Sequence, residues 1–573
     1  MKLESIAVRN FRGIGPADGL SFPTNDVQLV PIDFTADMIL VVGPNNAGKS
    51  SLLHAYDYFV SARRTAQLTD FFNKDPENQI LIEAKLRARS EELEDDQTRR
   101  WFDNNVATVR KVWNSPNSEA IKYSYDPVAH EWVEGGFGGL DTILQNRCPE
   151  PLWIKGFSDP AEIITQLQVL IREAVLEHLS ETKEFSEAES ALASLRDIIE
   201  GDEYVSEISE KISLSVRSFF PDASMRISNP TSDKGMTALF DKQAVVEISA
   251  QESPSLPFNL HGHGLQRQLV LSALQGAAAE LSHLKLTRAQ RQRTAPDSAR
   301  PRILLVEEPE LFLSPPAVRV MKRVVKKISE LESFQVMAAT HSPVMVDLSA
   351  ERQTVVRVDR RSGKSEYAQI GSQFFDRDER TTLRAATMFD TSCSEGVFGD
   401  KIIIVEGSTE LSVFQSIADR YFKETGCTQL LQTTVMQFGG KSEIPLMQRI
   451  LRHLKVPYIV VHDIDDELKN VQTWNLNFAI GDEVENARAE GLEANRVAFF
   501  RDFESAHRYT VSNGKDKAIS ALNYVNSLNL AEQSETVPVL FISNSIREGR
   551  AADIHLSNDS IYLINSIAAA FSN

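Results

Sequence analysis

Cysteine is scarce in this sequence. The three cysteines, Cys148, Cys393 and Cys427, lie far apart along 573 residues. Such spacing forms neither a zinc-binding pattern nor a disulfide framework. Because disulfides are typical of oxidising compartments, this usage favours a reducing, cytoplasmic setting.

Long apolar runs, internal repeats and low-complexity tracts are also missing. No stretch approaches the roughly 20 apolar residues that cross a bilayer, and no signal-peptide pattern follows Met1 and Lys2. We therefore expect no membrane partner. The net charge of −19 argues against a protein that coats nucleic acid non-specifically. It leaves open DNA binding through a local basic face, or through metal ions that offset carboxylates.

The chain is long enough for two to four domains, and its pattern changes along its length. The stretch LESIAVRNFRGI alternates as a half-buried strand does, and the apolar residues 38–43 predict a buried strand. Residues 159–219 instead place apolar residues three or four apart, which predicts helices. We interpret this block as an insertion that either packs on the core or forms a dimer interface.

The second half of the chain begins with a basic stretch. Residues 284–302 contain six basic residues and one acid, so they form either a solvated loop or an arm that contacts phosphates. Two apolar strands follow, and the pattern loosens at about residues 369–400. Beyond this connection strands and helices alternate again, which predicts a second, smaller parallel-sheet domain.

The segment GPNNAGKSS joins an apolar strand to a helix through a glycine-rich turn. Its residues have the G-x-x-x-x-G-K-S spacing of a phosphate-binding loop. The glycines let backbone amides surround the phosphates, Lys49 balances their charge, and Ser50 can bind Mg²⁺. We therefore predict an ATP–Mg²⁺ site. The residues expected to contact the cofactor here are Asn45, Asn46, Gly48, Lys49, Ser50 and Ser51.

A second apolar strand, in ILLVEEPE, ends in acidic residues. This position predicts that Glu307 lies beside the magnesium ion and that Glu308 polarises the attacking water. Most ATPases of this sort have Asp at the first of these positions. His341 follows the next strand, where a histidine can sense the γ-phosphate, although a partly buried structural histidine would give the same pattern.

Gly262, Gly264 and Gln266 precede an apolar helix, where such glycines either hold a phosphate or form an ordinary turn. Together with the phosphate-binding loop, the acidic strand and NFRGI near the N-terminus, they resemble the ABC-type ATPase head of the SMC and RecF kind. In that family two heads sandwich ATP between them. The resemblance therefore implies a homodimer or a homotetramer.

Carboxylates follow two strands of the second domain. Glu406 and Glu410 belong to IIIVEGSTE, and Asp463 and Asp465 belong to YIVVHDIDDE. Adjacent parallel strands bring their carboxyl ends together, and period-two geometry points both aspartates to one side. Four converging carboxylates are strongly unfavourable without divalent cations, so we predict an Mg²⁺ or Mn²⁺ site. The alternative is that they lie on solvated turns.

E-G-x-x-E followed by D-x-D resembles a Toprim domain, the metal-dependent catalytic module of topoisomerases, primases and some nucleases. An ABC head followed by Toprim resembles the OLD (overcoming lysogenization defect) nucleases, in a class similar to the Gabija nuclease subunit or to retron-associated OLD effectors. The resemblance implies two-metal cleavage or nicking of DNA in bacterial anti-phage defence, with the ATPase head as regulator. A helicase, or a retron reverse transcriptase with its nucleic acid, is a further partner that it suggests.

The same resemblance implies two more residues of the metal site. Glu504, in FFRDFESAH, has the position of a later acidic ligand. Lys517, in GKDKAIS, has that of a group that stabilises the transition state. Lys515 is the alternative to Lys517, because the family's frequent proline after this lysine is here Ala518.

The sequence thus predicts an α/β protein with an ABC-type (SMC/RecF-like) ATPase head, a helical insertion and a Rossmann-like Toprim domain. The expected boundaries are 1–155 and 223–385 for the two ATPase parts, 156–222 for an insertion that dimerises, and 398–573 for Toprim.

The expected activity is ATP-regulated, metal-dependent DNA endonuclease. One ion would activate water near Glu406, Glu410 and Asp463, and the other would stabilise the leaving oxygen near Asp463, Asp465 and Glu504. The alternatives are a DNA-sensing ATPase scaffold without nuclease activity and primase-like nucleotidyl transfer.

Overall fold

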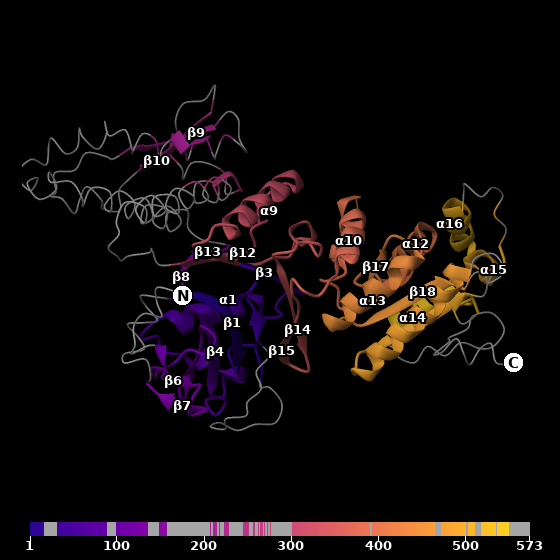
Figure 1. Ribbon diagram of the computed structural model, residues 1–573. Coiled ribbons are helices and arrows are strands. Elements are labelled where there is room, and N and C mark those ends of the chain that lie inside the picture. The colour runs from indigo at the N-terminus through magenta and orange to yellow at the C-terminus, as the bar shows by residue number, and fades with distance from the viewer. Residues whose placement is uncertain are drawn as a thin grey trace, which may run out of the picture. The chain divides into compact units, whose positions relative to one another are not determined.

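The structure is a computed structural model in which contacts define two compact units (Figure 1). The first comprises Met1–Val41, Gly48–Met345 and Ser362–Ser365, and the second comprises Val42–Ala47, Val346–Arg361 and Glu366–Asn573. The described residues are 1–15, 31–88, 99–135, 148–156, 301–389, 392–464, 471–499, 502–509, 517–534 and 536–548, with short pieces between 207 and 276 and position 511. The predicted helical insertion and basic stretch therefore fall almost wholly outside the described residues. The domain boundaries stay predictions.

An antiparallel sheet contains the predicted N-terminal strand. β1 (Lys2–Arg9) pairs with both β2 (Ile32–Asp33) and β4 (Ile80–Arg87). The strand order is β2-β1-β4-β5-β6-β7. The last three strands are β5 (Val106–Trp113), β6 (Ile121–Asp126) and β7 (Glu131–Glu134). Charged side chains on the sheet are paired, as Arg110 and Glu83 are at 2.6 Å, which lowers the cost of burying them.

The second sheet carries the phosphate-binding loop. Its strand order is β15-β14-β3-β13-β12-β8, and β3, β13, β12 and β8 run parallel. The five residues of β3 are all buried, as the apolar run predicted. The strands are β3 (Met38–Val42), β8 (Glu150–Ile154), β12 (Arg302–Glu307), β13 (Phe334–Ala339), β14 (Thr354–Arg361) and β15 (Lys364–Ile370).

Two helices pack near this sheet, α1 (Lys49–Val60) and α9 (Pro315–Ser329). Shorter elements complete the described part of this region. They are η1 (Leu68–Asp70), η2 (Phe72–Lys74), η7 (Pro343–Met345), β9 (Ala223–Ser228), β10 (Val245–Ala250) and β11 (Leu256–Pro257), the last three forming a sheet of order β11-β10-β9.

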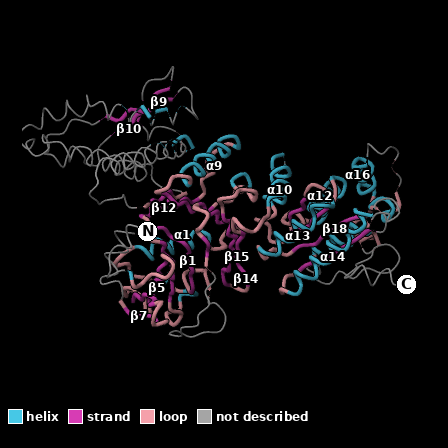
Figure 2. The backbone as a smooth tube through the Cα atoms, viewed as in Figure 1, coloured by secondary structure: helices cyan, strands magenta, loops and turns pink. Residues whose placement is uncertain are grey.

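A parallel sheet of order β17-β16-β18-β19 forms the core of the second unit. Helices alternate with its strands, as the sequence pattern predicted (Figure 2). The strands are β16 (Ile402–Val405), β17 (Thr434–Gln437), β18 (Tyr458–Asp463) and β19 (Ala494–Phe499). The helices are α10 (Arg377–Phe389), α11 (Ser392–Glu395), α12 (Ser408–Thr425), η8 (Lys441–Glu443), α13 (Ile444–His453), α14 (Val471–Ala489), α15 (Phe503–His507), α16 (Lys517–Ser527) and α17 (Pro538–Arg547).

Helices cover both faces of this parallel sheet. Alternate residues such as Ile459 and Val461 pack into one apolar cluster with α12, α16 and α17. On the other face, Tyr458 contacts α13 and α14 through hydrogen bonds to Gln448 and Glu483. The central strands are therefore buried on both sides and mostly apolar, and polar groups such as His462 and Asp463 concentrate at their ends.

Within the described ranges, no helix has both the length and the apolar character needed to cross a membrane.

Candidate active sites

The phosphate-binding loop turns through backbone conformations that favour glycine. Gly43 has φ +132°, and a Cβ atom there would lie 2.0 Å from the carbonyl oxygen of Val358. Gly48, with φ +104°, is the N-cap of α1, and Asn46 also has a positive φ of +61°. The motif glycines are thus required by backbone geometry and close approach.

The start of α1 is open to an anion. Its first turn carries no acidic side chain, and no side chain caps its amides. The exposed residues Asn45, Asn46 and Ser50 surround this helix start, and Ser51 is buried behind it. The helix dipole and the lack of an acidic first turn suit this end to a phosphate group.

Lys49 and the acids after β12 share one electrostatic environment. Lys49 is 7% exposed, and burial lowers its pKa to about 8 although Glu308 and Glu310 act in the opposite direction. Burial also lowers the pKa of His341, and the nearby charge of Lys49 adds to this effect. The structure therefore brings together the predicted Lys49, Glu308 and His341. Glu307 is the last residue of β12, where it is aligned with Ala339.

Glu310 was missed by the sequence analysis, although it lies within the quoted ILLVEEPE. Its carboxylate accepts hydrogen bonds from the Thr340 hydroxyl at 2.8 Å and from the His341 backbone N–H at 2.6 Å. It therefore holds the loop that carries the predicted sensor histidine. Glu308 adopts a left-handed φ of +47°, a strained conformation of the kind that concentrates at functional sites.

The glycine-rich turn before the apolar helix packs against the segment that follows these acids. A Cβ atom on Gly264 would lie 2.4 Å from the carbonyl oxygen of Phe312, so this position requires glycine. Gln266 is 2% exposed, and its backbone N–H donates to the Gly262 carbonyl at 3.0 Å. The assigned contact of Gly264 and Gln266 with a second nucleotide stays a prediction.

In the second unit, Glu406 and Glu410 flank the turn between β16 and α12. Glu406 follows β16 directly, and one of its carboxylate oxygens accepts the Asp463 backbone N–H at 3.1 Å. A Cβ atom on Gly407 would lie 3.1 Å from a carboxylate oxygen of Glu410. The glycine of E-G-x-x-E therefore makes room for the second carboxylate, which is 5% exposed.

Further charged groups reach the same edge of the sheet. Burial raises the pKa of Glu410, and the charge of Glu504 raises it further. Glu504, on α15, forms an ion pair of 3.0 Å with Lys517 at the start of α16. This pairing raises the pKa of Lys517, and the charge of Asp463 also raises it. The structure thus gathers Glu406, Glu410, Asp463, Glu504 and Lys517.

Asp465 and Lys515 lie outside the described residues. In the part of the chain that the structure describes, no three His, Cys, Asp or Glu side chains form a group that could hold a metal ion. Tyr509 is an additional neighbour that the sequence analysis missed. Burial raises the pKa of its hydroxyl, and the charges of Glu504, Glu410 and Asp463 raise it further.

Comparison with known families finds a match in each half of the chain. A model described as the Toprim domain of overcoming lysogenization defect protein-like proteins matches residues 397–465. A model described as an AAA ATPase domain matches residues 1–122 and 158–346, more than half of the chain. The Old nuclease of Escherichia phage P2 is 22% identical over 546 residues, which cover 88% of this chain and 86% of that protein. The chain belongs to the OLD family of nucleases.

A second OLD-family relative, the OLD nuclease of Thermus scotoductus, is 27% identical over 165 residues, which are 28% of this chain and 30% of that protein. Among solved structures, an Smc head bound to the C-winged helix domain of ScpA is similar with a TM-score of 0.42 and 16% identity, covering 65% of this chain and 98% of that one. The family matches and the observed sheets confirm the predicted fold class, an ATPase head followed by a Toprim domain.

Proposed function

We propose that this OLD-family protein is a divalent-metal-dependent DNA endonuclease regulated by ATP. The observation that carries the proposal is the convergence of Glu406, Glu410, Asp463 and Glu504 with Lys517 at the carboxyl edge of one parallel sheet. Open α/β sheets bind ligands at this edge. Burial, and then the like charge of Glu504, raise the pKa of Glu410, and perturbed carboxylates of this kind are typical of functional sites.

The donor set fits Mg²⁺ or Mn²⁺, because every candidate ligand is a carboxylate oxygen. As the described side chains are placed, no three of them form a group that could hold a metal ion. Binding would therefore draw Glu406, Glu410 and Asp463 together around one ion, and Asp463, Asp465 and Glu504 around a second. When bound, such ions activate water and stabilise the leaving oxygen of a phosphodiester.

The chain's own groups supply orientation and positive charge. Glu406 accepts the backbone N–H of Asp463, so the two candidate ligands are fixed relative to each other. The raised pKa of Lys517 keeps its ammonium group charged at neutral pH. That charge suits it to stabilise negative charge on a phosphate in the transition state.

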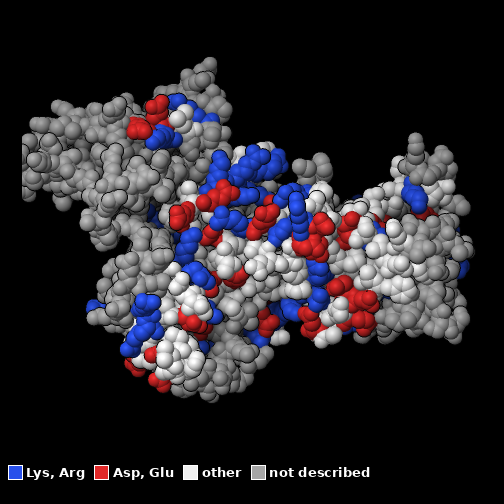
Figure 3. All heavy atoms as spheres, viewed as in Figure 1, with Lys and Arg blue, Asp and Glu red and all other residues white. Residues whose placement is uncertain are grey.

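A basic face on α9 supports DNA as the proposed substrate. Helix α9 places Arg319, Lys322, Arg323, Lys326 and Lys327 at helical spacing, opposite a buried apolar stripe. Lys and Arg side chains gather over α9 in Figure 3. In a chain of net charge −19 such a concentration is suited to phosphate contacts, and binding through it should weaken as salt rises.

ATP with Mg²⁺ would bind at the phosphate-binding loop. Lys49 would contact the phosphates, Ser50 and Glu307 the magnesium ion, and Glu308 the attacking water. His341, held by Glu310, would sense the γ-phosphate. Two heads would enclose the nucleotide in a homodimer or homotetramer, and binding or hydrolysis would change the geometry of the Toprim site. We place this activity in bacterial anti-phage defence, with a helicase or a retron reverse transcriptase as a further partner.

One assay tests the proposal against the scaffold alternative. Purified full-length protein is incubated with supercoiled and with linear DNA, Mg²⁺ or Mn²⁺, and with or without ATP. We expect nicking or cleavage that Asp463→Ala abolishes and that the exposed Asp419→Ala leaves unchanged. Intact ATP hydrolysis without cleavage of either DNA would support the scaffold.

The ATPase half is tested with a second pair of variants. Lys49→Ala should lose ATP hydrolysis and the response of cleavage to ATP, while retaining cleavage in the absence of nucleotide. The control is Lys85→Ala, an exposed lysine on β4, which should hydrolyse ATP normally. Equal cleavage with and without ATP in the wild type would exclude the regulatory part of the proposal.

A further inference from the structure

The backbone carbonyl of Asp463 is held by two buried side chains. The Lys441 ammonium donates to it at 2.6 Å, and the Nδ1 atom of His462 lies 2.8 Å from it. Lys441 is 6% exposed and His462 is completely buried. A buried lysine is costly because its charge loses water. It is here directed at the residue that we assign to the metal site.

A third buried residue decides the protonation state of the histidine. Arg496 Nε lies 2.8 Å from His462 Nε2, and arginine can only donate. Nε2 must therefore accept, so the neutral ring carries its proton on Nδ1 and donates it to the Asp463 carbonyl. Burial also lowers the pKa of His462 well below its ordinary value, with Arg496 and Lys441 acting in the same direction.

The sequence accommodates this arrangement at some cost to stability. Arg496 is 1% exposed, and within the described residues its Nη1 and Nη2 atoms have no hydrogen-bond partner. A Cβ atom on Gly481 would lie 2.9 Å from Arg496 Nη1, so glycine provides space inside α14. Glycine within a helix costs about 1 kcal/mol relative to alanine. Two residues with positive φ, Gly439 at +65° and Gly440 at +125°, precede Lys441.

The backbone on both sides of the Asp463 carbonyl is held as well. The Asp463 N–H donates to Glu406, and the Ile464 N–H donates to the Phe499 carbonyl at 3.0 Å. The buried Asn477 side chain donates to the Ile464 carbonyl at 2.9 Å. The segment that begins the D-x-D motif is therefore fixed before any ligand binds.

We propose that Lys441, His462 and Arg496 form a positioning network that sets the orientation of Asp463 and thereby the affinity of its carboxylate for a divalent cation. This inference rests on the proposed function, since the cation site belongs to it. The network contributes no ligand. It removes conformational freedom from the backbone that carries one, as residues behind the ligands do in other metal sites.

His462→Phe is the most informative variant, because it removes the hydrogen bonds of a neutral ring without changing the charge of the site. We measure Mn²⁺ binding to full-length protein by titration calorimetry without DNA, and thermal unfolding in EDTA. The expected result is Mn²⁺ affinity at least about tenfold weaker, the range found when such supporting residues are lost. Lys441→Arg, which retains a donor, should bind Mn²⁺ more tightly than Lys441→Met.

Matched controls lie at the other end of the same domain. The Nδ1 atom of His453 also contacts a backbone carbonyl, that of Arg449 at 3.0 Å, so His453→Phe controls for loss of a similar bond. Lys455→Met controls for loss of a lysine charge. Both should leave Mn²⁺ affinity unchanged. If His462→Phe only lowers the melting temperature in EDTA and binds Mn²⁺ normally, the network is structural and the inference is wrong.

The same measurements would give a different result if the proposed function were wrong. If wild-type protein binds no Mn²⁺, or binds it equally after Asp463→Ala, the metal site itself is disproved and the positioning inference fails with it. Wild-type binding that Asp463→Ala weakens and His462→Phe does not would leave the metal site intact and overturn only the network.

Discussion

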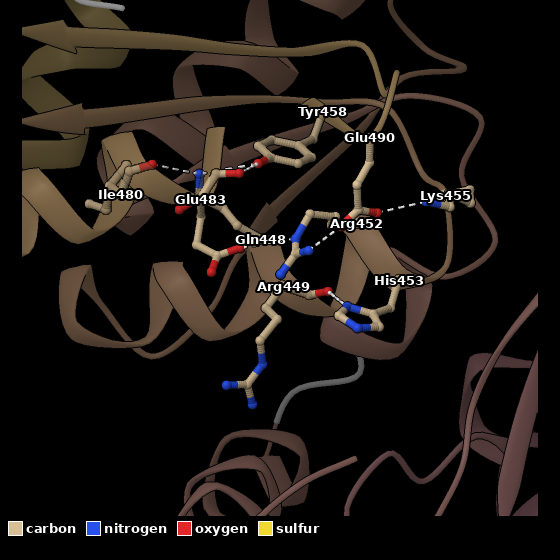
Figure 4. A network of polar contacts seen from close by, with 9 residues as sticks. All are labelled: Gln448, Arg449, Arg452, His453, Lys455, Tyr458, Ile480, Glu483 and Glu490. Carbon is tan, nitrogen blue, oxygen red and sulfur yellow. Dashed lines mark hydrogen bonds and ion pairs between the residues drawn. The ribbon is translucent and has the colours of Figure 1, made fainter. Parts of the chain in front are cut away.

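Charged residues gather near both ends of strand β18. At the amino end opposite charges are paired, whereas at the carboxyl end most of the charges are negative. Figure 4 shows the group at the amino end, where Arg452 lies between Glu483 and Glu490. Lys455 pairs with Glu490 at 2.7 Å. The Tyr458 hydroxyl donates to the Glu483 carbonyl at 3.2 Å, which ties the strand to α14.

At the carboxyl end the charges are mostly of one sign. Glu406, Glu410, Asp463 and Glu504 gather there, and Lys517 forms an ion pair with Glu504. Burial and Glu504 raise the pKa of Glu410 rather than lowering it. The amino-end group is thus stabilised by its own ion pairs, whereas the carboxylates at the other end would be stabilised by the divalent cation that we propose. On this proposal, the first group holds the fold and the second is kept for chemistry.

The largest expected effect is on the like-charged end. Glu410→Gln should reduce cleavage to background, since it removes a candidate ligand, and should raise the stability of the metal-free protein. A raised pKa means that the folded protein holds the proton more tightly than the unfolded chain does. Acidification from neutral pH through this pKa should therefore stabilise wild-type protein in EDTA. The melting temperature of the variant in EDTA should therefore change less with pH than that of the wild type. An equal dependence on pH in the two proteins would contradict the assignment.

Lys517→Met should separate catalysis from stability. Loss of its positive charge should lower kcat about 10²–10³-fold, the effect of removing one group that stabilises transition-state charge. The ammonium is half exposed, so its ion pair with Glu504 should contribute less than about 1 kcal/mol to the free energy of unfolding. Single-turnover cleavage and denaturant unfolding measure the two effects. A normal kcat in this variant would show that another residue has the catalytic role, and Lys515 is the alternative.

Arg452→Ala tests the paired end. Removal of this cation leaves Glu483 and Glu490 facing each other, and we expect a loss of about 1–2 kcal/mol in the free energy of unfolding, because the pairs are partly buried. The rate of DNA cleavage at a temperature where the variant is folded should stay within twofold of wild type. A specific loss of cleavage by folded protein would show that the two ends are not independent.

The smallest effect is expected from Lys455→Met. This lysine and its partner Glu490 are both close to half exposed, so its removal should change the free energy of unfolding by about 0.5 kcal/mol or less. Urea unfolding measures this change, and raising the salt concentration should reduce it further. A change above about 1 kcal/mol would mean that the amino-end group acts as a cooperative network.

The sequence by itself determined the parts of both sites that are local in the chain. A phosphate-binding loop and E-G-x-x-E are short turns between a strand and a helix, so their residues are brought together by chain continuity alone. At Gly43 a larger side chain would collide with the Val358 carbonyl, and at Gly407 it would crowd the Glu410 carboxylate. Parallel strands with apolar runs then predicted that the carboxylates of Glu406 and Asp463 share one edge.

Only the tertiary structure decided which side chains support these residues. Glu310 reaches the loop of His341, 31 positions further along the chain. Arg496 reaches His462 across 34 positions, and Lys441 reaches Asp463 across 22. Such pairs have no fixed spacing, because the intervening helices and turns can vary in length. In the sequence, each of these residues looks like an ordinary charged or polar residue. Its contact with its partner can be recognised only in the folded structure.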